Sequence, residues 1–382
     1  MNTVRLGIIG LGNIGKVHAG AVVDGKITRC ELTAVCSTDP SRLALFPAAR
    51  PFNSPAELIR SDTVDAVLIA TPHYSHVPIG IAALRQGLHV LVEKPIAVHK
   101  AAAEKLIAAH TNPRQVFAAM FNQRPDPFHQ KIRAMIRGGE LGKIRRINWI
   151  TTHWFRTAAY YASGSWRATW AGEGGGVLLN QSPHQLDLLQ WFLGMPVKVR
   201  AFCSFGRYHN IEVEDDVTAY LEFPNGATGI FITSTGEHPG TNRLELTGER
   251  GKLVFEDGQL TFLRNDTPMT KFSRAAKPMF NGPVVEKIAI CPVGQAVGHV
   301  AIIQNFVDAI LDGTPLIARA EEGIHSVELA NAMLFSSLKN KTVELPLDGR
   351  AYARLLRSLI KNSRRKKIVH PQYADDLTLH FR

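Results

Sequence analysis

Apolar and polar residues follow two different patterns along this 382-residue chain, and the change comes near residue 123. Before that point, short β-branched apolar runs alternate with segments of helical period. This alternation predicts a doubly wound parallel sheet with helices on both faces. Beyond it, longer segments of alternating polarity follow one another through turns. These segments predict a mainly antiparallel, open sheet with helices on one face, so the expected fold class is α/β with an α+β second domain.

The expected elements follow from these two patterns. In the first region the predicted strands are 4–9, 32–36, 66–70, 88–92 and 116–119, and the predicted helices are 14–23, 55–60, 75–86 and 100–109. In the second region the predicted strands are 144–153, 197–205, 217–223, 228–235, 243–247, 252–255 and 259–263, and the predicted helices are 183–193, 299–311 and 320–338. Residues 265–298 have no regular pattern and are expected to form a loop or insertion. We therefore predict domains at 1–122 and 123–345, followed by a helical, basic extension at 346–382.

A glycine-rich turn follows the first predicted strand. Residues 10–15, GLGNIG, have the GxGxxG spacing that binds a dinucleotide when it lies between a strand and a helix. The first glycine would permit the tight turn, the second would let the backbone approach the pyrophosphate, and the third would let the helix pack closely on the strand. This context predicts a Rossmann dinucleotide-binding domain. The cofactor contacts expected in the turn are Gly10, Gly12, Asn13, Ile14 and Gly15.

Another strand end should face the same crevice, because open α/β sheets bind ligands at the carboxyl ends of their strands. The strand at 66–70 is followed by Thr71, Pro72 and His73, with His76 one turn further on. We expect these four residues to contact the cofactor. The alternative is that Thr71 and Ser75 cap the next helix and that His76 packs inside the protein.

The strand at 88–92 ends in Glu93-Lys94-Pro95. Pro95 favours an extended backbone at Lys94. We expect the lysine to point into the crevice, where its ammonium group would bind a reacting oxygen and share its developing negative charge. Glu93 is expected beside the cofactor. The alternative is an exposed lysine paired with Glu93.

His184 is a third candidate. Ser182 as N-cap, Pro183 at the first helical position and Gly194 after the last turn predict a helix over 183–193. His184 would then lie in the first turn, where the positive end of the helix dipole favours a neutral imidazole. A neutral imidazole can accept the proton of an alcohol. The alternative is a histidine that packs in the core or caps the helix.

Residues 149–170 contain four of the chain's five tryptophans, with tyrosines and arginines between them. Flat aromatic faces can cover the C–H face of a sugar while a few polar groups bind its hydroxyls. The side chains expected to reach a carbohydrate are Trp154, Tyr160, Trp166 and Arg167. Some of the rings in this segment are also expected in the core.

Taken together, these segments resemble the Gfo/Idh/MocA family of glucose-fructose oxidoreductases and inositol dehydrogenases. The shared motifs are the glycine fingerprint with His18 three residues beyond it, ATPxxxH at 70–76, HVLVEKP at 89–95 and GGGVLLNQSPHQLD at 174–187. The resemblance covers roughly residues 4–345. It implies a nicotinamide-dependent enzyme acting on a sugar or polyol, and a homodimer or homotetramer formed through the second sheet. It also implies that His184 is the general base or holds the reacting hydroxyl, and that Asn122 and Arg124 contact nicotinamide or substrate.

The chain departs from the common family pattern at Asn180, where many members have an aspartate. An asparagine can bind a substrate hydroxyl, but it cannot supply negative charge to stabilise an imidazolium. Three possibilities stay open: His184 works with Lys94 alone, or Asp187 or Asp216 supplies the charge. Asp187 would lie one turn along the same helix face. It could equally be a buried structural carboxylate.

The choice between NAD and NADP depends on residues 37–42, which follow the second strand and should meet the adenosine ribose. Ser37 with Arg42 favours the 2′-phosphate of NADP, whereas Asp39 favours the 2′-hydroxyl of NAD. The sequence leaves both cofactors open.

The formal net charge of +11 is concentrated at the C-terminal end, because residues 350–382 contain nine Lys or Arg and two Asp or Glu. The basic run Arg364–Lys367 has no aromatic residues between its charges, so we interpret it as a solvated end and consider nucleic-acid binding unfavoured. No apolar run reaches the roughly 18 residues of a membrane helix. The four cysteines lack the spacing of a zinc site or disulfide framework. A cytoplasmic protein without a metal site is expected.

The expected activity is reversible hydride transfer between nicotinamide and a secondary hydroxyl of a sugar, glycoside or anhydro-sugar. The tryptophan-rich segment and residues 202–241 resemble the branch of the family that oxidises glycosides and anhydro-sugars, in some cases to 3-keto products, more than the inositol branch. Two alternatives remain. One is an inositol dehydrogenase, and the other is a sensor or regulator that binds cofactor without turnover.

Overall fold

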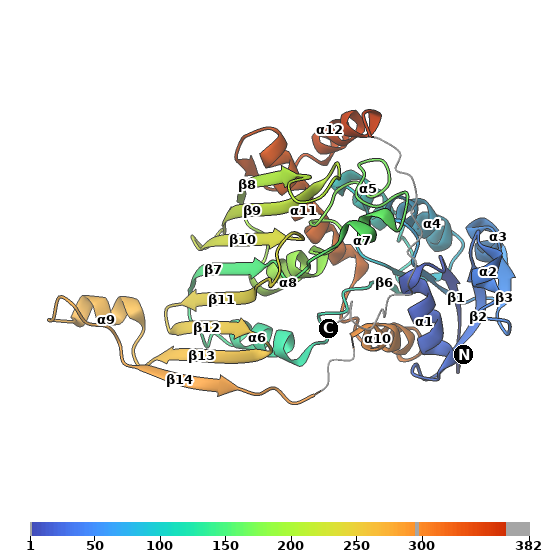
Figure 1. Ribbon diagram of the computed structural model, residues 1–382. Coiled ribbons are helices and arrows are strands. Elements are labelled where there is room, and N and C mark those ends of the chain that lie inside the picture. Colours follow the sequence, from blue (N-terminus) through green and yellow to red (C-terminus); the bar gives the residue numbers. More distant parts are fainter. Residues whose placement is uncertain (1, 295–297, 364–382) are drawn as a thin grey trace.

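The computed structural model describes residues 2–294 and 298–363, and it contains two sheets (Figure 1). The first sheet is entirely parallel, with the strand order β3-β2-β1-β4-β5-β6. Its strands are β1 (Val4–Ile9), β2 (Cys30–Cys36), β3 (Arg50–Phe52), β4 (Ala66–Ile69), β5 (His89–Val92) and β6 (Phe117–Ala119). The order reverses between β1 and β4, which is the switch point where sheets of this class bind ligands.

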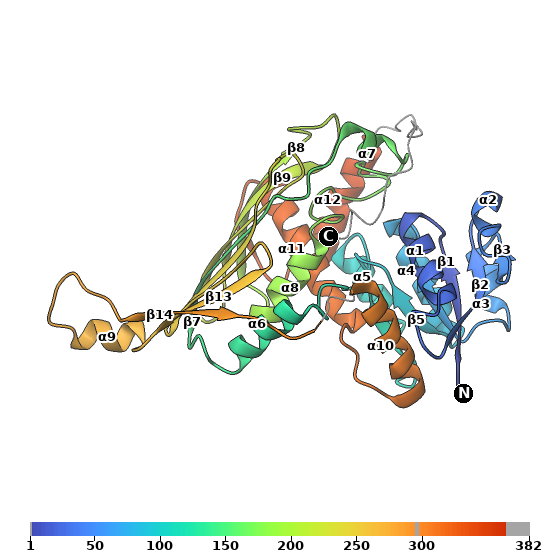
Figure 2. The ribbon, with the colours of Figure 1, turned by 60° about the horizontal axis from the view of Figure 1, so that its bottom comes forward.

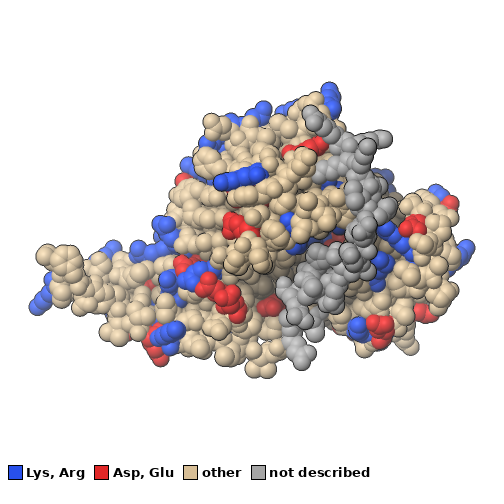
Figure 3. All heavy atoms as spheres, in the orientation of Figure 1, with Lys and Arg blue, Asp and Glu red and all other residues tan. Residues whose placement is uncertain are grey.

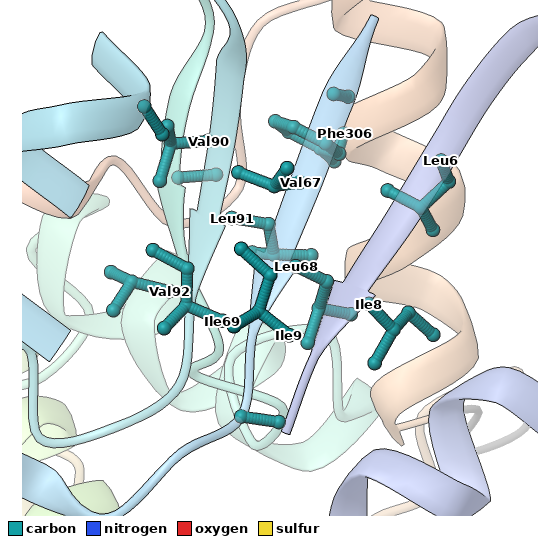
Figure 4. Close-up of a cluster of buried hydrophobic side chains, with 14 of the residues drawn as sticks. Leu6, Ile8, Ile9, Val67, Leu68, Ile69, Val90, Leu91, Val92 and Phe306 are labelled. Atoms are coloured by element: carbon teal, nitrogen blue, oxygen red, sulfur yellow. The ribbon is translucent and has the colours of Figure 1, made fainter. Parts of the chain in front are cut away.

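Helices cover both faces of this sheet, as expected for strands that are apolar throughout. They are α1 (Asn13–Val23), α2 (Pro40–Leu43), α3 (Pro55–Arg60), α4 (His73–Arg85) and α5 (Lys100–Ala108). A further helix, α10 (Gly298–Asp312), comes from late in the chain, and its Phe306 packs against the apolar side chains of β1, β4 and β5 (Figure 4). The core of the first domain therefore includes a helix from the range predicted as the second domain.

The second sheet has nine strands in the order β14-β13-β12-β11-β7-β10-β9-β8-β15. The strands are β7 (Ile144–Thr151), β8 (Lys198–Phe205), β9 (Glu214–Glu222), β10 (Thr228–Ser234), β11 (Asn242–Gly248), β12 (Gly251–Glu256), β13 (Gln259–Asn265), β14 (Val285–Ile290) and β15 (Val343–Glu344). Only β7 and β10 pair in parallel; the other neighbours are antiparallel. The predicted α/β class with a parallel first sheet and a mainly antiparallel second sheet is confirmed.

One face of the second sheet is covered by helices, and among the described residues the other face is bare (Figure 2). The helices of this part of the chain are α6 (Pro127–Arg137), α7 (Ala158–Ala162), α8 (Pro183–Leu193), α9 (Met269–Ala275), the short 3-10 helix η1 (Ala320–Glu322), α11 (Gly323–Leu338) and α12 (Gly349–Lys361). Helices α8 and α11 lie between the large sheet and the first domain (Figure 2). This position brings the start of α8 to the crevice of the first sheet.

One prediction about the second half of the chain is wrong: residues 265–298 are not irregular, because they contain α9 and the edge strand β14, which pairs with β13. The helix expected after residue 345 is confirmed as α12, and its Tyr352 and Leu356 are buried in the core of the second domain. The basic run Arg364–Lys367 lies outside the described residues.

Basic and acidic side chains are interspersed over the face of the molecule drawn in Figure 3. No helix within residues 2–294 and 298–363 combines the length and the apolar character needed to cross a membrane.

Candidate active site

The turn after β1 is shaped by its glycines. Gly10 has a φ of +99°, and a Cβ there would lie 2.7 Å from the carbonyl oxygen of Ala70. A Cβ at Gly15 would lie 1.9 Å from the carbonyl oxygen of Gly10, so helix α1 could not approach β1 with any other residue there. The chain therefore requires glycine at both positions for steric reasons.

Gly12 differs from its neighbours, because a Cβ there would meet nothing within 4 Å. It is the N-cap of α1, and neither a side-chain cap nor an acidic residue satisfies the backbone N–H groups of the first turn. Unsatisfied N–H groups at the positive end of a helix are suited to a pyrophosphate. The residues present thus fit a dinucleotide at the switch point between β1 and β4.

The turn after β4 lies at the same switch point. The Oγ1 of Thr71 is buried and has no hydrogen-bond partner in the part of the chain that the structure describes. It does not cap α4, whose N-cap is the exposed Pro72. Thr71 and Pro72 therefore remain candidates for cofactor contacts. His73 faces the second domain instead: its Nδ1 lies 3.2 Å from the carbonyl oxygen of Glu173, and its ring meets the edge of Trp166.

The expectation that His76 contacts the cofactor is wrong. The side chain is completely buried, and its Nδ1 and Nε2 lie 2.8 and 2.7 Å from the carbonyl oxygens of Pro95 and Thr71. His76 connects the turns that follow β4 and β5. The packing alternative describes it correctly.

Glu93 is committed to contacts inside the protein. Its Oε1 lies 2.7 Å from Nε2 of the buried His18, and its Oε2 accepts the backbone N–H of Lys94 at 3.0 Å. Burial favours the neutral acid, but the hydrogen bond from His18 and the nearby charges outweigh it and hold the pKa of Glu93 at about 2. This carboxylate fixes the turn that carries Lys94 and does not itself reach toward the cofactor.

Lys94 is half-buried, and its Nζ donates to the carbonyl oxygen of Asn180 at 2.8 Å. The lysine is therefore not an exposed partner of Glu93. Burial lowers its pKa, while Glu93 and Glu173 favour the charged form. The bond to Asn180 places the ammonium beside the chain just before α8, and two of its three N–H donors remain available.

His184 lies in the first turn of α8 and is only 8% exposed. Burial, followed by the charge of Lys94, lowers its pKa well below the usual value, so the imidazole is neutral as predicted. Its Nδ1 is buried and has no partner among the described residues. Ser182 is the N-cap residue as predicted, but its hydroxyl makes no capping hydrogen bond and is paired with that of Thr233 at 2.7 Å.

The expectation that Arg124 contacts nicotinamide or substrate is wrong. Its side chain is completely buried, and its Nε and Nη2 lie 2.7 and 2.6 Å from the two carboxylate oxygens of Asp187. Its Nη1 donates to the carbonyl oxygen of Ile317 and to Glu322. Asp187 is therefore the structural carboxylate considered above and cannot serve His184. Asp216 is paired with Arg207 at 2.8 Å, so the same holds for it.

Asn122 lies just beyond β6, and its Nδ2 is 3.1 Å from Nε2 of His299. Its Oδ1 is buried without a partner among the described residues. Asn122 therefore remains a candidate cofactor or substrate contact.

The four aromatic and basic residues expected to bind a carbohydrate lie in one cluster. The Tyr160 hydroxyl accepts from Nη1 of Arg167 at 2.9 Å and from Nε2 of Gln181 at 3.0 Å. The guanidinium of Arg167 lies over the rings of Tyr160 and Trp166, and that of Arg156 lies near Trp154 and Tyr160. Gln181 follows Asn180, so the cluster adjoins Lys94. Trp149, Tyr161 and Trp170 are buried in the core, as expected for some of the rings, whereas Phe155 is 43% exposed.

Two buried carboxylates near the site were not anticipated from the sequence. Glu173 is 2% exposed, and its carboxylate accepts the side-chain N–H of Asn180 and, at 2.5 Å, the backbone N–H of Ala168. Glu214 accepts the backbone N–H groups of Gly176 and Leu178 at 2.8 and 3.1 Å. The only sequence signal for Glu173 is its place directly before the glycine triplet.

The end of β2 leaves the choice of cofactor open. Ser37 is almost buried, and its Oγ accepts the backbone N–H of Asp39 at 3.1 Å. Asp39 caps α2 and pairs with Arg42 at 3.0 Å, and Arg42 also donates to the carbonyl oxygen of Leu11 in the glycine turn. Both charged side chains are thus next to the expected adenosine site. Because they pair with each other, the structure favours neither the 2′-hydroxyl of NAD nor the 2′-phosphate of NADP.

Within the described ranges, no three His, Cys, Asp or Glu side chains are grouped so that they could hold a metal ion. The four cysteines are free thiols.

Comparisons with known proteins agree with this geometry. The model for the oxidoreductase family with an NAD-binding Rossmann fold matches residues 4–120, and the model for the GFO/IDH/MocA C-terminal domain matches residues 129–254. Levoglucosan dehydrogenase of Pseudarthrobacter phenanthrenivorans is 25% identical over 91% of this chain and 99% of that protein. Myo-inositol 2-dehydrogenase of Thermotoga maritima is 26% identical over 66% of this chain and 75% of that protein.

A similar solved structure is the WlbA dehydrogenase of Bordetella pertussis in complex with NADH and UDP-GlcNAcA. It superimposes with a TM-score of 0.75 at 26% identity, covering 91% of this chain and all of that chain.

Proposed function

The chain belongs to the Gfo/Idh/MocA family of oxidoreductases, and from this premise we propose that it is an NAD(P)-dependent dehydrogenase acting on a secondary hydroxyl of a sugar, glycoside or anhydro-sugar. The observation that carries the proposal is that Lys94 is held next to the segment that leads to His184. Lys94 follows β5, and its bond to the carbonyl oxygen of Asn180 places it just before α8, close enough for its charge to lower the pKa of His184. A charged donor and a neutral acceptor thus lie near one another.

In this proposal each protein group has one task. Lys94 donates a hydrogen bond to the reacting oxygen and stabilises the negative charge that develops on it. His184 accepts the hydroxyl proton as general base. A nicotinamide cofactor held by the glycine turn at Gly10–Gly15 would supply the hydride acceptor that oxidation of the carbinol to a carbonyl requires. Because the imidazole of His184 is neutral in the folded protein, it is ready to accept the proton at neutral pH.

The aromatic cluster supports a carbohydrate as substrate. Trp154, Tyr160 and Trp166 offer flat faces, and Arg167 and Gln181 offer donors that already converge on the Tyr160 hydroxyl. Such a combination of aromatic faces and a few fixed polar groups suits a sugar ring. The levoglucosan and inositol dehydrogenases among the relatives are consistent with either an anhydro-sugar or an inositol, and inositol oxidation remains the second candidate.

The direct test is cofactor reduction by the purified protein. NAD⁺ or NADP⁺ is supplied with a panel containing levoglucosan, myo-inositol, methyl glucosides and UDP-sugars, and reduced nicotinamide is followed by its absorbance. We expect turnover with at least one anhydro-sugar or glycoside, and NMR of the product would identify the oxidised carbon. Tight cofactor binding without turnover on any compound would instead favour the sensor or regulator.

We also propose a homodimer or homotetramer formed through the bare face of the second sheet. Phe202 on β8 and Tyr220 on β9 are 62% and 40% exposed on this sheet. Large exposed apolar side chains on a sheet face favour association with another surface. Sedimentation should show an oligomer that Phe202→Glu weakens, whereas a monomer at all concentrations would contradict the assignment.

A further inference from the structure

A buried carboxylate lies directly behind Asn180. Glu173 is 2% exposed and forms no ion pair with any described residue. Its two oxygens are held instead by neutral donors, the side-chain amide of Asn180 and the backbone N–H of Ala168. Burying a carboxylate without a paired cation is costly, so its retention at this place calls for a reason.

The hydrogen bond to Glu173 determines how the Asn180 amide is turned. An ionised carboxylate only accepts hydrogen bonds, so Asn180 must present its NH₂ group to Glu173. The Oδ1 of Asn180 then faces the other way, and no described residue donates to it. The backbone carbonyl oxygen of the same residue accepts from Lys94, so Asn180 contacts both the buried carboxylate and the ammonium group.

Glu173 also brings negative charge to a site that is otherwise rich in cations. Burial raises its pKa, while Arg167, the N–H of Ala168, Asn180 and Lys94 favour the ionised form. In the opposite direction, Glu173 is one of the two carboxylates that favour the charged form of Lys94. The loop that carries Glu173 is tied to the first domain by His73, whose ring nitrogen meets its carbonyl oxygen.

We propose that Glu173 is a positioning residue that fixes Asn180 as an acceptor for a substrate hydroxyl and supplies the negative charge that Asn180 lacks. In this pair, the amide of Asn180 contacts the substrate, and the charged carboxylate of Glu173 lies behind it, bonded to the amide. This inference rests on the proposed dehydrogenase function. It assigns to the pair of residues the charge that neither Asp187 nor Asp216 can supply.

The test exchanges the carboxylate of residue 173 and the amide of residue 180, first one at a time and then together. Glu173→Gln removes the charge and lets the amide of Asn180 turn over, so kcat/KM should fall about 10- to 100-fold, as for other residues that orient a ligand from behind. Asn180→Asp places two buried carboxylates against each other, which should lower both activity and the melting temperature. The double variant E173Q/N180D restores one carboxylate and one amide in hydrogen-bonding distance, so it should recover at least tenfold over either single variant.

Glu214→Gln is the matched control. Glu214 is also a buried carboxylate that holds the glycine triplet, but its Oε1 accepts backbone N–H groups, those of Gly176 and Leu178, and no side-chain amide. This variant should keep kcat/KM close to that of the unchanged protein. Cofactor affinity, measured by fluorescence titration, should be the same in all four variants.

The proposal is overturned if the wild-type protein is active but E173Q keeps its kcat/KM, or if the double variant is no better than E173Q. A structure of the wild-type protein with cofactor and substrate provides a test that needs no variant to fold: Asn180 Oδ1 should accept from a substrate hydroxyl while its Nδ2 remains on Glu173, and the reversed amide would refute the proposal. Absence of turnover in the wild-type protein would instead refute the dehydrogenase function, so the two failures are distinguishable.

Discussion

The cofactor side and the substrate side of the crevice depend on different kinds of contact. On the cofactor side the backbone forms the site: the close contacts at Gly10 and Gly15 require glycine in the turn, and the open space at Gly12 leaves room for a phosphate. The substrate side depends on side chains that contact distant segments, such as Lys94 on the carbonyl oxygen of Asn180 and His73 on that of Glu173, which are 86 and 100 residues apart in sequence. A site made of backbone is therefore visible in a short motif, whereas a site made of side-chain pairs depends on how distant segments fold together.

Lys94→Ala should show most clearly that the substrate side can be damaged while the cofactor side stays intact. Loss of the ammonium group removes the charge that stabilises the reacting oxygen, so turnover should fall about 10²- to 10⁴-fold. Cofactor affinity should remain, because the glycine turn is untouched. Steady-state kinetics and a cofactor titration measure the two effects, with Lys26→Ala as a control at an exposed lysine. Near wild-type turnover on the true substrate would disprove the catalytic assignment.

Arg124→Met should affect stability and not substrate affinity. It leaves the carboxylate of Asp187 buried without its cation, which typically costs about 3–5 kcal/mol. Urea unfolding measures the loss, and Asp187→Leu in the same chain should recover part of it because no charge is then left unpaired. If Arg124→Met instead kept its stability and raised KM, the arginine would belong to the substrate site after all.

Glu214→Gln should change how stability depends on pH. Burial raises the pKa of Glu214 to about 7, above the value of about 4.3 expected in the unfolded chain. Between these values the folded state binds more protons, so the stability from this group is complete below pH 4.3 and is lost as the pH rises toward 7. The variant lacks this loss. Its free energy of unfolding relative to that of the wild type should therefore rise by on the order of 3 kcal/mol when the pH is raised from 4.5 to 7.5.

The buried histidines titrate in both proteins, so their contribution cancels in this comparison. Urea unfolding of wild type and variant at the two pH values provides the measurement. A stability difference that stays constant with pH would show that Glu214 is already ionised in the folded protein at pH 4.5.

Gly12→Ala tests the cofactor side on its own and should have the smallest effect. A methyl group at Gly12 meets no protein atom, so the unfolding free energy should change by about 1 kcal/mol or less. It would occupy the space through which the pyrophosphate approaches the backbone, so cofactor affinity should fall about tenfold or more, which is about 1.4 kcal/mol.

Gly20→Ala is the control on the same helix, because a Cβ there also meets nothing within 4 Å but lies away from the turn. It should leave cofactor affinity unchanged and stabilise the helix by about 0.5–1 kcal/mol. Equal effects of the two variants on cofactor binding would mean that no phosphate lies at Gly12.

The same contrast explains what the sequence could predict. Periodicity located most strands of both sheets, because an apolar pattern directly records which face is buried. The end signals Pro183 and Gly194 located helix α8 to the residue. The pattern missed the short strands β3 and β15 and the edge strand β14, which is held by its pairing with β13. The motifs located Lys94 and His184, since each follows a recognisable strand end or helix start.

Partners of buried polar groups could not be predicted. The sequence predicts a substrate contact for Arg124 because it does not reveal that Asp187 of α8 meets this turn residue. The sequence offers Asp187 and Asp216 as carboxylates near Asn180, but the carboxylate that contacts it is Glu173. Glu173 lies in a loop, where no helical or strand pattern of apolar residues indicates its position. Such pairings are decided by side-chain geometry at close range, which a one-dimensional pattern does not contain.

The most direct test of the central claim is a structure of the protein with cofactor and a substrate identified by the activity panel. We predict that Lys94 Nζ and a ring nitrogen of His184 both lie about 2.6–3.2 Å from one substrate oxygen, the one whose carbon faces the nicotinamide. If that oxygen were held by neither group, or if the two side chains bound different oxygens, the proposed division of work between them would be contradicted.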